Sequence, residues 1–260
     1  MSKMSLSSIR FGSPYCTFRR LPLGNRHFSV LHRSCFPIDL SLYLVTNRCY
    51  TKDDSHFIDK VLQTVHGGVT CVQYSDPYVD LHNQFKTALS LREKLRASGV
   101  PLIINNNVEV ALAVQADGVH LGQKDLAYGH ARRLIGSRAI IGLTVDTWDD
   151  VLKAEELDVD YLGVQIFPSK HTKPTSLSIW GLEGLRKIRA ISKHRIVAIG
   201  GINLDNLLHV YKELNINEKS DGIAMVGELW RTSDPKMAAK RVMDLFHKFS
   251  VDKMRDHASL

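Results

Sequence analysis

Residues 101–125 read PLIINNNVEVALAVQADGVHLGQKD, and this stretch contains one complete strand–helix–strand unit. Two short apolar runs, Pro101–Asn105 and Asp117–His120, are expected to be strands. A polar turn and a helical stretch separate them. Repeated units with continuous apolar strands are typical of a parallel sheet that is covered by helices.

The same unit recurs along the chain from Leu42 onward. The expected strands are Ser41–Thr46, Val69–Tyr74, Pro101–Asn105, Asp117–His120, Ala139–Thr144, Tyr161–Val164, Ile196–Ile199 and Gly222–Met225. Between them, apolar residues recur at the spacing of amphipathic helices. The first turn, residues 46–50, lacks the glycine-rich motif of an open dinucleotide-binding sheet. We therefore predict an α/β protein with a single (β/α)8 TIM barrel, a fold that takes about 250 residues.

The net charge of +7 is concentrated at one end of the chain. Residues 1–38 contain six Lys and Arg residues and no acidic residue, which leaves +1 for residues 39–260. A nearly neutral barrel does not favour a nucleic-acid partner. No apolar run approaches the roughly 20 residues that span a bilayer, so no membrane segment is expected either. The expected partners are small phosphorylated molecules, and the sequence leaves the oligomeric state open.

The chain is expected to have three parts, with boundaries set by composition. Residues 1–38 are a basic, Ser-rich extension that is either disordered or a transit peptide. Residues 39–250 form the barrel domain, and residues 251–260 form a C-terminal tail. The expected location is the cytoplasm, or an organelle if the extension is a transit peptide. Four cysteines without a CxxC pair indicate reduced thiols rather than a disulfide framework or a zinc site.

Ligands of a TIM barrel bind at the C-terminal ends of its strands, so these positions hold the candidate site residues. Three amides, Asn105–Asn107, stand at the end of the third strand. They suit either the binding of a heterocycle or phosphate, or a purely structural role in a turn. After the fourth strand, Asp125 suits either a magnesium ligand or a helix N-cap. His120, within that strand, is interpreted as a core histidine whose hydrogen bonds are satisfied.

Three later loops have the composition of a phosphate site. The loop at 166–173 carries hydroxyls and lysines, which suit either a phosphate or a solvated surface. Glycines follow the seventh strand, at 200–201, and the eighth, at 227. Backbone N–H groups at such glycines can approach an anion closely, and these two loops form the recurring phosphate site of TIM barrels.

These residues lie in segments that, from about Leu42 to Phe249, resemble the thiamine phosphate synthase family. The segment at 116–125 is the most specific of them. The matching segments are LYLVT (42–46), GGVTCVQ (67–73), PLIIN (101–105), ADGVHLGQKD (116–125), IFP (166–168), TK (172–173), AIGGI (198–202) and DGIAM (221–225).

The resemblance implies a transferase of thiamine biosynthesis that joins a pyrimidine methyl diphosphate to a thiazole phosphate, with release of diphosphate and Mg²⁺ as cofactor. It implies that Gln73, Asn105, Thr144 and Lys173 bind the pyrimidine diphosphate, and that Lys173 and Thr144 also have a catalytic role. It implies that Ser169, Thr172, Gly201, Val226 and Gly227 hold the thiazole phosphate. It implies that Asp125 and Asn106 bind the metal.

The sequence departs from the family pattern at the diphosphate end of this site. The family's Gln-x-Arg-x-Lys motif reads Gln73-Tyr74-Ser75-Asp76-Pro77, so both cations are missing. The family's Asn-Asp-Asp reads Asn105-Asn106-Asn107, so one magnesium carboxylate is lost. Gln165 replaces the usual Gly-Pro before Ile-Phe-Pro. An Arg and a Lys each make strong, charge-assisted contacts with phosphate, so these changes weaken leaving-group stabilisation.

Two alternatives to an active synthase follow from these departures. The first is a catalytically weakened or silent barrel that binds thiamine precursors, with Lys170 and Lys173 as partial replacements for the lost cations in the weakened case. The second is an isomerase like the thiazole tautomerase that resembles the synthase. That relative is expected to carry a histidine near the end of the fifth strand, where this chain has Asp146.

Overall fold

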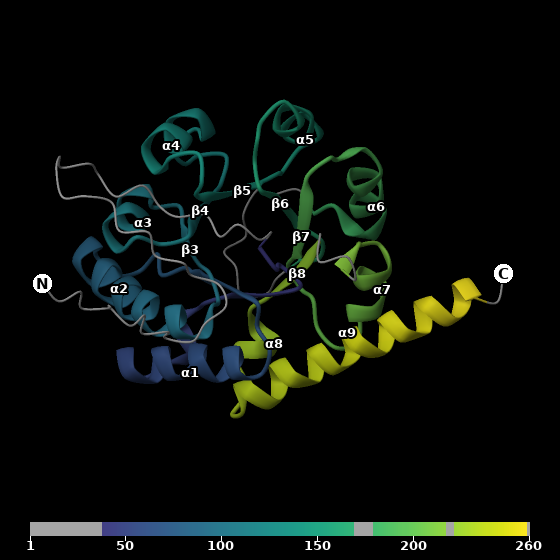
Figure 1. Ribbon diagram of the computed structural model, residues 1–260, viewed down its shortest axis with the longest axis horizontal. Coiled ribbons are helices and arrows are strands. Elements are labelled where there is room, and N and C mark those ends of the chain that lie inside the picture. Colours follow the sequence, from purple (N-terminus) through teal and green to yellow (C-terminus); the bar gives the residue numbers. More distant parts are fainter. Residues whose placement is uncertain (1–37, 169–178, 217–220, 259–260) are drawn as a thin grey trace, which may run out of the picture.

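A computed structural model describes residues 38–168, 179–216 and 221–258 of the chain, and it contains a closed parallel barrel (Figure 1). The eight strands pair in sequence order, and β8 closes on β1. They are β1 (Leu42–Val45), β2 (Cys71–Tyr74), β3 (Leu102–Asn105), β4 (Gly118–Leu121), β5 (Ile140–Thr144), β6 (Tyr161–Gln165), β7 (Arg195–Ile199) and β8 (Gly222–Met225). The predicted (β/α)8 barrel and all eight expected strands are confirmed.

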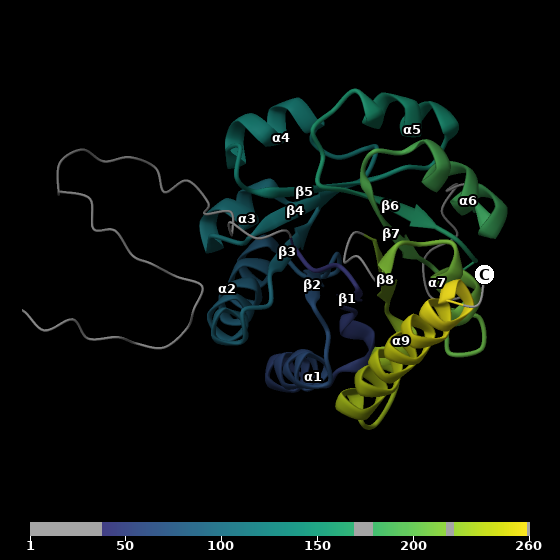
Figure 2. The same cartoon turned by 45° about the vertical axis from the view of Figure 1, so that its right-hand side comes forward.

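Helices surround this barrel, as Figure 2 shows for α1 to α7 and α9. They are η1 (Arg48–Tyr50), α1 (Asp54–His66), α2 (Leu81–Ser98), α3 (Val108–Val114), α4 (Tyr128–Ile135), α5 (Trp148–Glu155), α6 (Gly181–Ile191), α7 (Leu207–Lys212), α8 (Gly227–Trp230) and α9 (Pro235–Ala258). Apolar faces of the helices pack on the outer face of the sheet, where Phe57, Val61 and Leu91 are fully buried. None of the helices in the described part of the chain is long and apolar enough to cross a membrane.

Helix α9 begins after an N-cap and extends past the predicted domain boundary. The Asp234 carboxylate accepts a hydrogen bond from the Met237 N–H at 3.0 Å, which caps the start of the helix. The helix then continues to Ala258, past residue 250, where the tail was expected to begin. No Gly or Pro occurs between residues 236 and 258, so no residue there interrupts the helix.

The interior of the barrel is filled by side chains from alternate positions of the strands. Tyr43, Cys71, Ile103 and Tyr161 form its centre and are almost completely buried. Residues 38–41 cover the N-terminal end of the strands, where Leu40 is fully buried. The described cysteines, Cys49 and Cys71, are free thiols, in agreement with the sequence analysis.

Three aspartates repeat one arrangement at the N-terminal end of the barrel. Asp117, Asp160 and Asp221 each precede an even-numbered strand. Each carboxylate accepts a hydrogen bond from a backbone N–H near the start of the preceding, odd-numbered strand. It also pairs with an arginine of the helix that leads into this odd-numbered strand. The donors are Leu102 and Arg92 for Asp117, Ile141 and Arg132 for Asp160, and Ile196 and Arg189 for Asp221. These contacts stabilise the end of the barrel that lies opposite the expected site.

Candidate active site

Polar side chains point inward at the C-terminal ends of five successive strands, β2 to β6. They occupy alternate positions, which direct them into the mouth of the barrel. These residues are Gln73, Asn105, His120, Thr144 and Gln165. The Gln73 Nε2 donates a hydrogen bond to Asn105 Oδ1 at 2.6 Å. The structure therefore brings together Gln73, Asn105 and Thr144, three of the four residues predicted to bind the pyrimidine diphosphate.

His120 lies between the centre of the barrel and its mouth. Its Nδ1 is 3.1 Å from the Tyr161 hydroxyl, and its Nε2 is 2.8 Å from Thr144 Oγ1. The prediction of a histidine with satisfied hydrogen bonds is confirmed. Burial in the barrel lowers the pKa of His120 to about 4, so the ring is neutral near pH 7. A neutral imidazole at this position has one donor and one acceptor.

A cavity of about 480 Å³ opens at the ends of β2 and β3. Its lining includes Asp76, Pro77 and Glu109, together with Asn105–Asn107. Ser75 is adjacent, since its Oγ accepts a hydrogen bond from Asn105 Nδ2 at 3.4 Å. The positions that carry the family's two cations, Ser75 and Pro77, therefore lie at this cavity, and neither side chain brings a charge to it.

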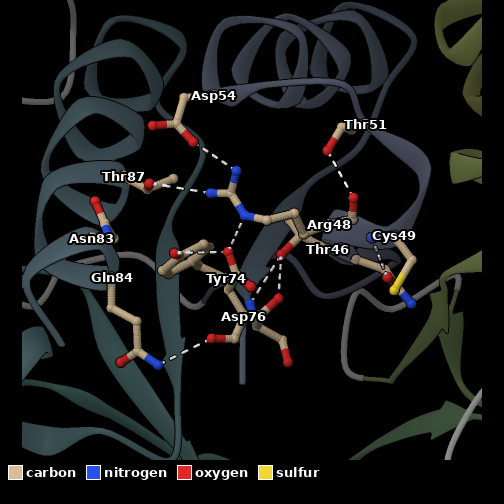
Figure 3. A network of polar contacts seen from close by, with 12 residues as sticks. Thr46, Arg48, Cys49, Thr51, Asp54, Tyr74, Asp76, Asn83, Gln84 and Thr87 are labelled. Carbon is tan, nitrogen blue, oxygen red and sulfur yellow. Dashed lines mark hydrogen bonds and ion pairs between the residues drawn. The ribbon is translucent and has the colours of Figure 1, made fainter. Parts of the chain in front are cut away.

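Arg48 lies close to these positions, in a polar network that the sequence analysis did not identify (Figure 3). Its guanidinium pairs with Asp76, with Asp54 at 2.6 Å, and with Thr87 Oγ1 at 3.3 Å. It also lies over the Phe57 ring, 4.9 Å from the centroid. The two carboxylates raise the pKa of Arg48, although burial opposes them. Because its charge is already balanced by two carboxylates, Arg48 does not replace the missing cations.

The residues predicted to bind the metal lie at neighbouring strand ends. The Asn106 N–H donates to the His120 carbonyl at 2.8 Å, which holds the β3 loop against β4. The Asp125 carboxylate accepts from the Gly122 N–H at 2.7 Å, and helix α4 has no side-chain cap, so Asp125 is not its N-cap. Among the described residues, no three His, Cys, Asp or Glu side chains form a metal cluster. Asp125 and Asn106 offer hard oxygen ligands, which fit Mg²⁺ that takes its other ligands from phosphate and water.

The glycine loop after β7 brings backbone close to backbone. Gly200 and Gly201 have φ values of 93° and 58°, a conformation that glycine adopts readily. A Cβ on Gly201 would lie 2.8 Å from the Pro168 carbonyl oxygen, so this loop touches the end of the β6 loop. Gly227 begins α8, directly after Val226. Ser169, Thr172 and Lys173, and also Lys170, lie outside the described residues.

Asp146 follows β5 at the position where the tautomerase alternative expects histidine. Its Oδ1 is buried and has no hydrogen-bond partner among the residues that the structure describes. Burial, together with the neighbouring Asp150, raises the pKa of the Asp146 carboxyl. The Asp146 carboxyl group does not supply the imidazole that the tautomerase hypothesis requires at this position.

Comparison with known proteins agrees with the fold. The family model described as thiamine monophosphate synthase matches residues 42–229. A thiamine-phosphate synthase from Albidiferax ferrireducens is 41% identical over 206 residues, which are 79% of this chain and 91% of that protein. One from Syntrophomonas wolfei is 38% identical and aligns over 81% of this chain and 98% of its own length. The solved thiamine phosphate pyrophosphorylase from Pyrococcus furiosus is 31% identical, with a TM-score of 0.72, over 82% of this chain and 98% of that one.

The Arg48–Asp76 pair predicts a large loss of stability when the cation alone is removed. The Asp76 side chain is fully buried, so Arg48→Met leaves a buried carboxylate without its partner. We expect the free energy of unfolding to fall by about 3 kcal/mol. Urea denaturation followed by circular dichroism measures this loss.

Two further variants test the cause of that loss. Adding Asp76→Asn to Arg48→Met should restore most of the stability, because the buried charge is removed. Arg186→Met breaks the exposed pair with Glu213 and should cost less than about 1 kcal/mol. Equal losses of stability in Arg48→Met and Arg186→Met would contradict the conclusion that the loss at Arg48 comes from a buried, unpaired carboxylate.

The lowered pKa of His120 predicts a dependence of stability on pH. The unfolded chain binds a proton at His120 below about pH 6.5, whereas the folded protein binds it only near pH 4. Stability should therefore fall as the pH drops from 6.5 toward 4, by about 2 kcal/mol from this group, since His120 keeps some solvent contact. Denaturation of the wild type and His120→Gln across this range measures the difference. Parallel curves for the two proteins would exclude this contribution.

Proposed function

The chain belongs to the thiamine monophosphate synthase family, and on this basis we propose that it condenses 4-amino-2-methyl-5-(diphosphooxymethyl)pyrimidine with thiazole phosphate to give thiamine phosphate and diphosphate. The observation that carries the proposal is the polar mouth of the barrel, which Gln73, Asn105 and Thr144 line from the C-terminal ends of β2, β3 and β5. The similarity to named synthases extends over about four-fifths of the chain.

The pyrimidine diphosphate is proposed to bind across β2 to β5. The amides of Gln73 and Asn105 and the hydroxyl of Thr144 offer donors and acceptors to the heterocycle, and the diphosphate extends toward the cavity beside Ser75 and Pro77. Lys173 is proposed to contact the departing diphosphate. Because the reaction separates charge between diphosphate and pyrimidine, these groups act by orienting the substrate and by stabilising the negative charge that leaves.

The thiazole phosphate is proposed to bind at the loops after β6, β7 and β8. Ser169 and Thr172 would provide hydroxyls, while the backbone at Gly201, Val226 and Gly227 would provide N–H donors. The close approach of Gly201 to the end of the β6 loop supports a shared pocket between these loops. Such a pocket would hold the thiazole nitrogen near the pyrimidine carbon that it attacks.

Magnesium is proposed as the cofactor, held by Asp125 and Asn106. With one carboxylate and one amide, the site depends on diphosphate oxygens and water for its remaining ligands. When bound, the ion would neutralise part of the diphosphate charge. The replacement of one carboxylate by Asn106 is expected to weaken metal binding in the absence of the substrate.

A barrel that binds thiamine precursors without catalysis is the second candidate. It is favoured by the uncharged side chains at Ser75, Pro77 and Asn106, which lie beside the diphosphate cavity. The two candidates differ in one outcome. The synthase turns over both substrates with Mg²⁺, whereas the silent barrel binds thiazole phosphate and forms no product.

We predict that the purified protein forms thiamine phosphate. Restoring the family's Arg and Lys at positions 75 and 77 should accelerate this reaction. The double variant Ser75→Arg/Pro77→Lys should raise kcat/KM for the pyrimidine diphosphate about tenfold or more, because each new charge-assisted contact is worth roughly 1.5–3 kcal/mol. The KM for thiazole phosphate should stay within about twofold. Steady-state kinetics with each substrate varied in turn measure both values.

The control adds the same charges at a distance from the mouth. Leu152→Arg/Ile191→Lys places them at exposed positions of α5 and α6 and should leave kcat/KM unchanged. Calorimetric binding of thiazole phosphate without any product would establish the silent barrel instead. An equal response of the two double variants would show that the effect is not local to the cavity.

A further inference from the structure

Six side chains form a continuous hydrogen-bonded series across the interior of the barrel, which we term the interior network. In order, they are Asn105, Gln73, Tyr43, Tyr161, His120 and Thr144. The Tyr43 hydroxyl donates to Gln73 Oε1 at 2.9 Å, and it lies 2.8 Å from the Tyr161 hydroxyl. The network thus connects the two sides of the mouth that are proposed to bind the pyrimidine diphosphate.

Two glycines provide the space for the centre of this network. A Cβ on Gly142 would lie 2.1 Å from Tyr161 Cζ, and a Cβ on Gly163 would lie 2.8 Å from His120 Cε1. The rings of His120 and Tyr161 stack with an interplanar angle of 22°. Strands β5 and β6 therefore carry no side chain at the positions where the two rings lie. The two rings are therefore confined by each other and by the backbone at Gly142 and Gly163.

With the Nε2 side of the Gln73 amide facing Asn105, the number of hydrogens fixes the direction of every other bond in the network. Gln73 Nε2 donates to Asn105, so Gln73 Oε1 is the acceptor for Tyr43. A hydroxyl has one hydrogen, and that of Tyr43 is used on Gln73. Tyr161 must then donate to Tyr43, and its own oxygen must accept from Nδ1–H of His120.

The charge state of His120 completes the assignment. Because burial lowers the pKa of His120, the ring is neutral near pH 7 and carries one N–H. With that hydrogen on Nδ1, Nε2 is an acceptor, and the Thr144 hydroxyl donates to it at 2.8 Å. Among the described residues no donor reaches Thr144 Oγ1, so its lone pairs are left for a donor group in the mouth. Burial, followed by the neighbouring Tyr161 and Cys71, also raises the pKa of Tyr43, so its hydroxyl keeps its hydrogen.

We propose that Tyr161 is a positioning residue for the pyrimidine diphosphate, which fixes the Gln73 amide through Tyr43 and the Thr144 hydroxyl through His120. Tyr161 is 1% exposed and acts only through its neighbours. The choice of substrate rests on the proposed function, whereas the direction of the hydrogen bonds rests on the interior network alone. Without the Tyr161 hydroxyl, His120 is free to place its hydrogen on Nε2 and to donate to Thr144, which changes what Thr144 offers to a substrate.

The kinetic test compares Tyr161→Phe with Tyr211→Phe. Both remove one hydroxyl from a buried tyrosine, and Tyr211 bonds Ser250 in the contact between α7 and α9, away from the mouth. We expect Tyr161→Phe to lower kcat/KM for the pyrimidine diphosphate about tenfold while the KM for thiazole phosphate stays within about twofold. Tyr211→Phe should change neither value. Equal kinetics of the two variants would overturn the proposal.

The second test reads the network directly and requires no turnover. Nitrogen-15 NMR of histidine-labelled protein, with the His120 signals identified by their loss in His120→Gln, distinguishes the two neutral tautomers. We expect hydrogen on Nδ1 in the wild type and on Nε2 in Tyr161→Phe. Hydrogen on Nε2 in the wild type would overturn the proposal even if Tyr161→Phe fails to fold. If the protein forms no thiamine phosphate, the proposed function fails, and the NMR result still decides the direction of the network.

Discussion

Tyr43 and Tyr161 are sealed inside the barrel, where water cannot satisfy a polar atom, so each hydroxyl must find its partner within the protein. Much of the site depends on this constraint. Gly142 and Gly163 leave room for the aromatic rings, and the neutral ring of His120 supplies the donor that the Tyr161 hydroxyl requires. The same hydrogen bonds set the orientation of Gln73 at one side of the mouth and Thr144 at the other. The geometry of the mouth is therefore determined from within the barrel.

The mouth has two unlike halves. On the side of β2 and β3, the cavity beside Ser75 and Pro77 has lost the charges of the family pattern, and the nearby Arg48 is paired with Asp54 and Asp76. On the side of β7, Gly201 lies against the end of the β6 loop, where the thiazole phosphate is proposed to bind. We therefore expect a synthase whose weaker step is the binding and stabilisation of the departing diphosphate.

The periodic pattern of the sequence was sufficient to predict the barrel, because short β-branched runs and amphipathic helices are local properties. It also predicted which strand ends carry Gln73, Asn105 and Thr144. The partners of His120 were not predictable, since Tyr161 and Thr144 come from other strands and meet it only after closure. The Arg48–Asp76 pair was missed for the same reason, and no local breaker marks the end of α9, which continues past residue 250.

A crystal structure of the protein with Mg²⁺ and an unreactive analogue of the pyrimidine diphosphate would show whether the interior network orients the groups that bind the substrate. We expect the pyrimidine ring at the mouth, within hydrogen-bond distance of Gln73 or Asn105 and of Thr144 Oγ1. We also expect the diphosphate to point to the cavity beside Ser75 and Pro77. A ligand bound elsewhere, with the hydrogen bonds of Gln73 and Thr144 unchanged and no contact to them, would show that the network does not orient the substrate.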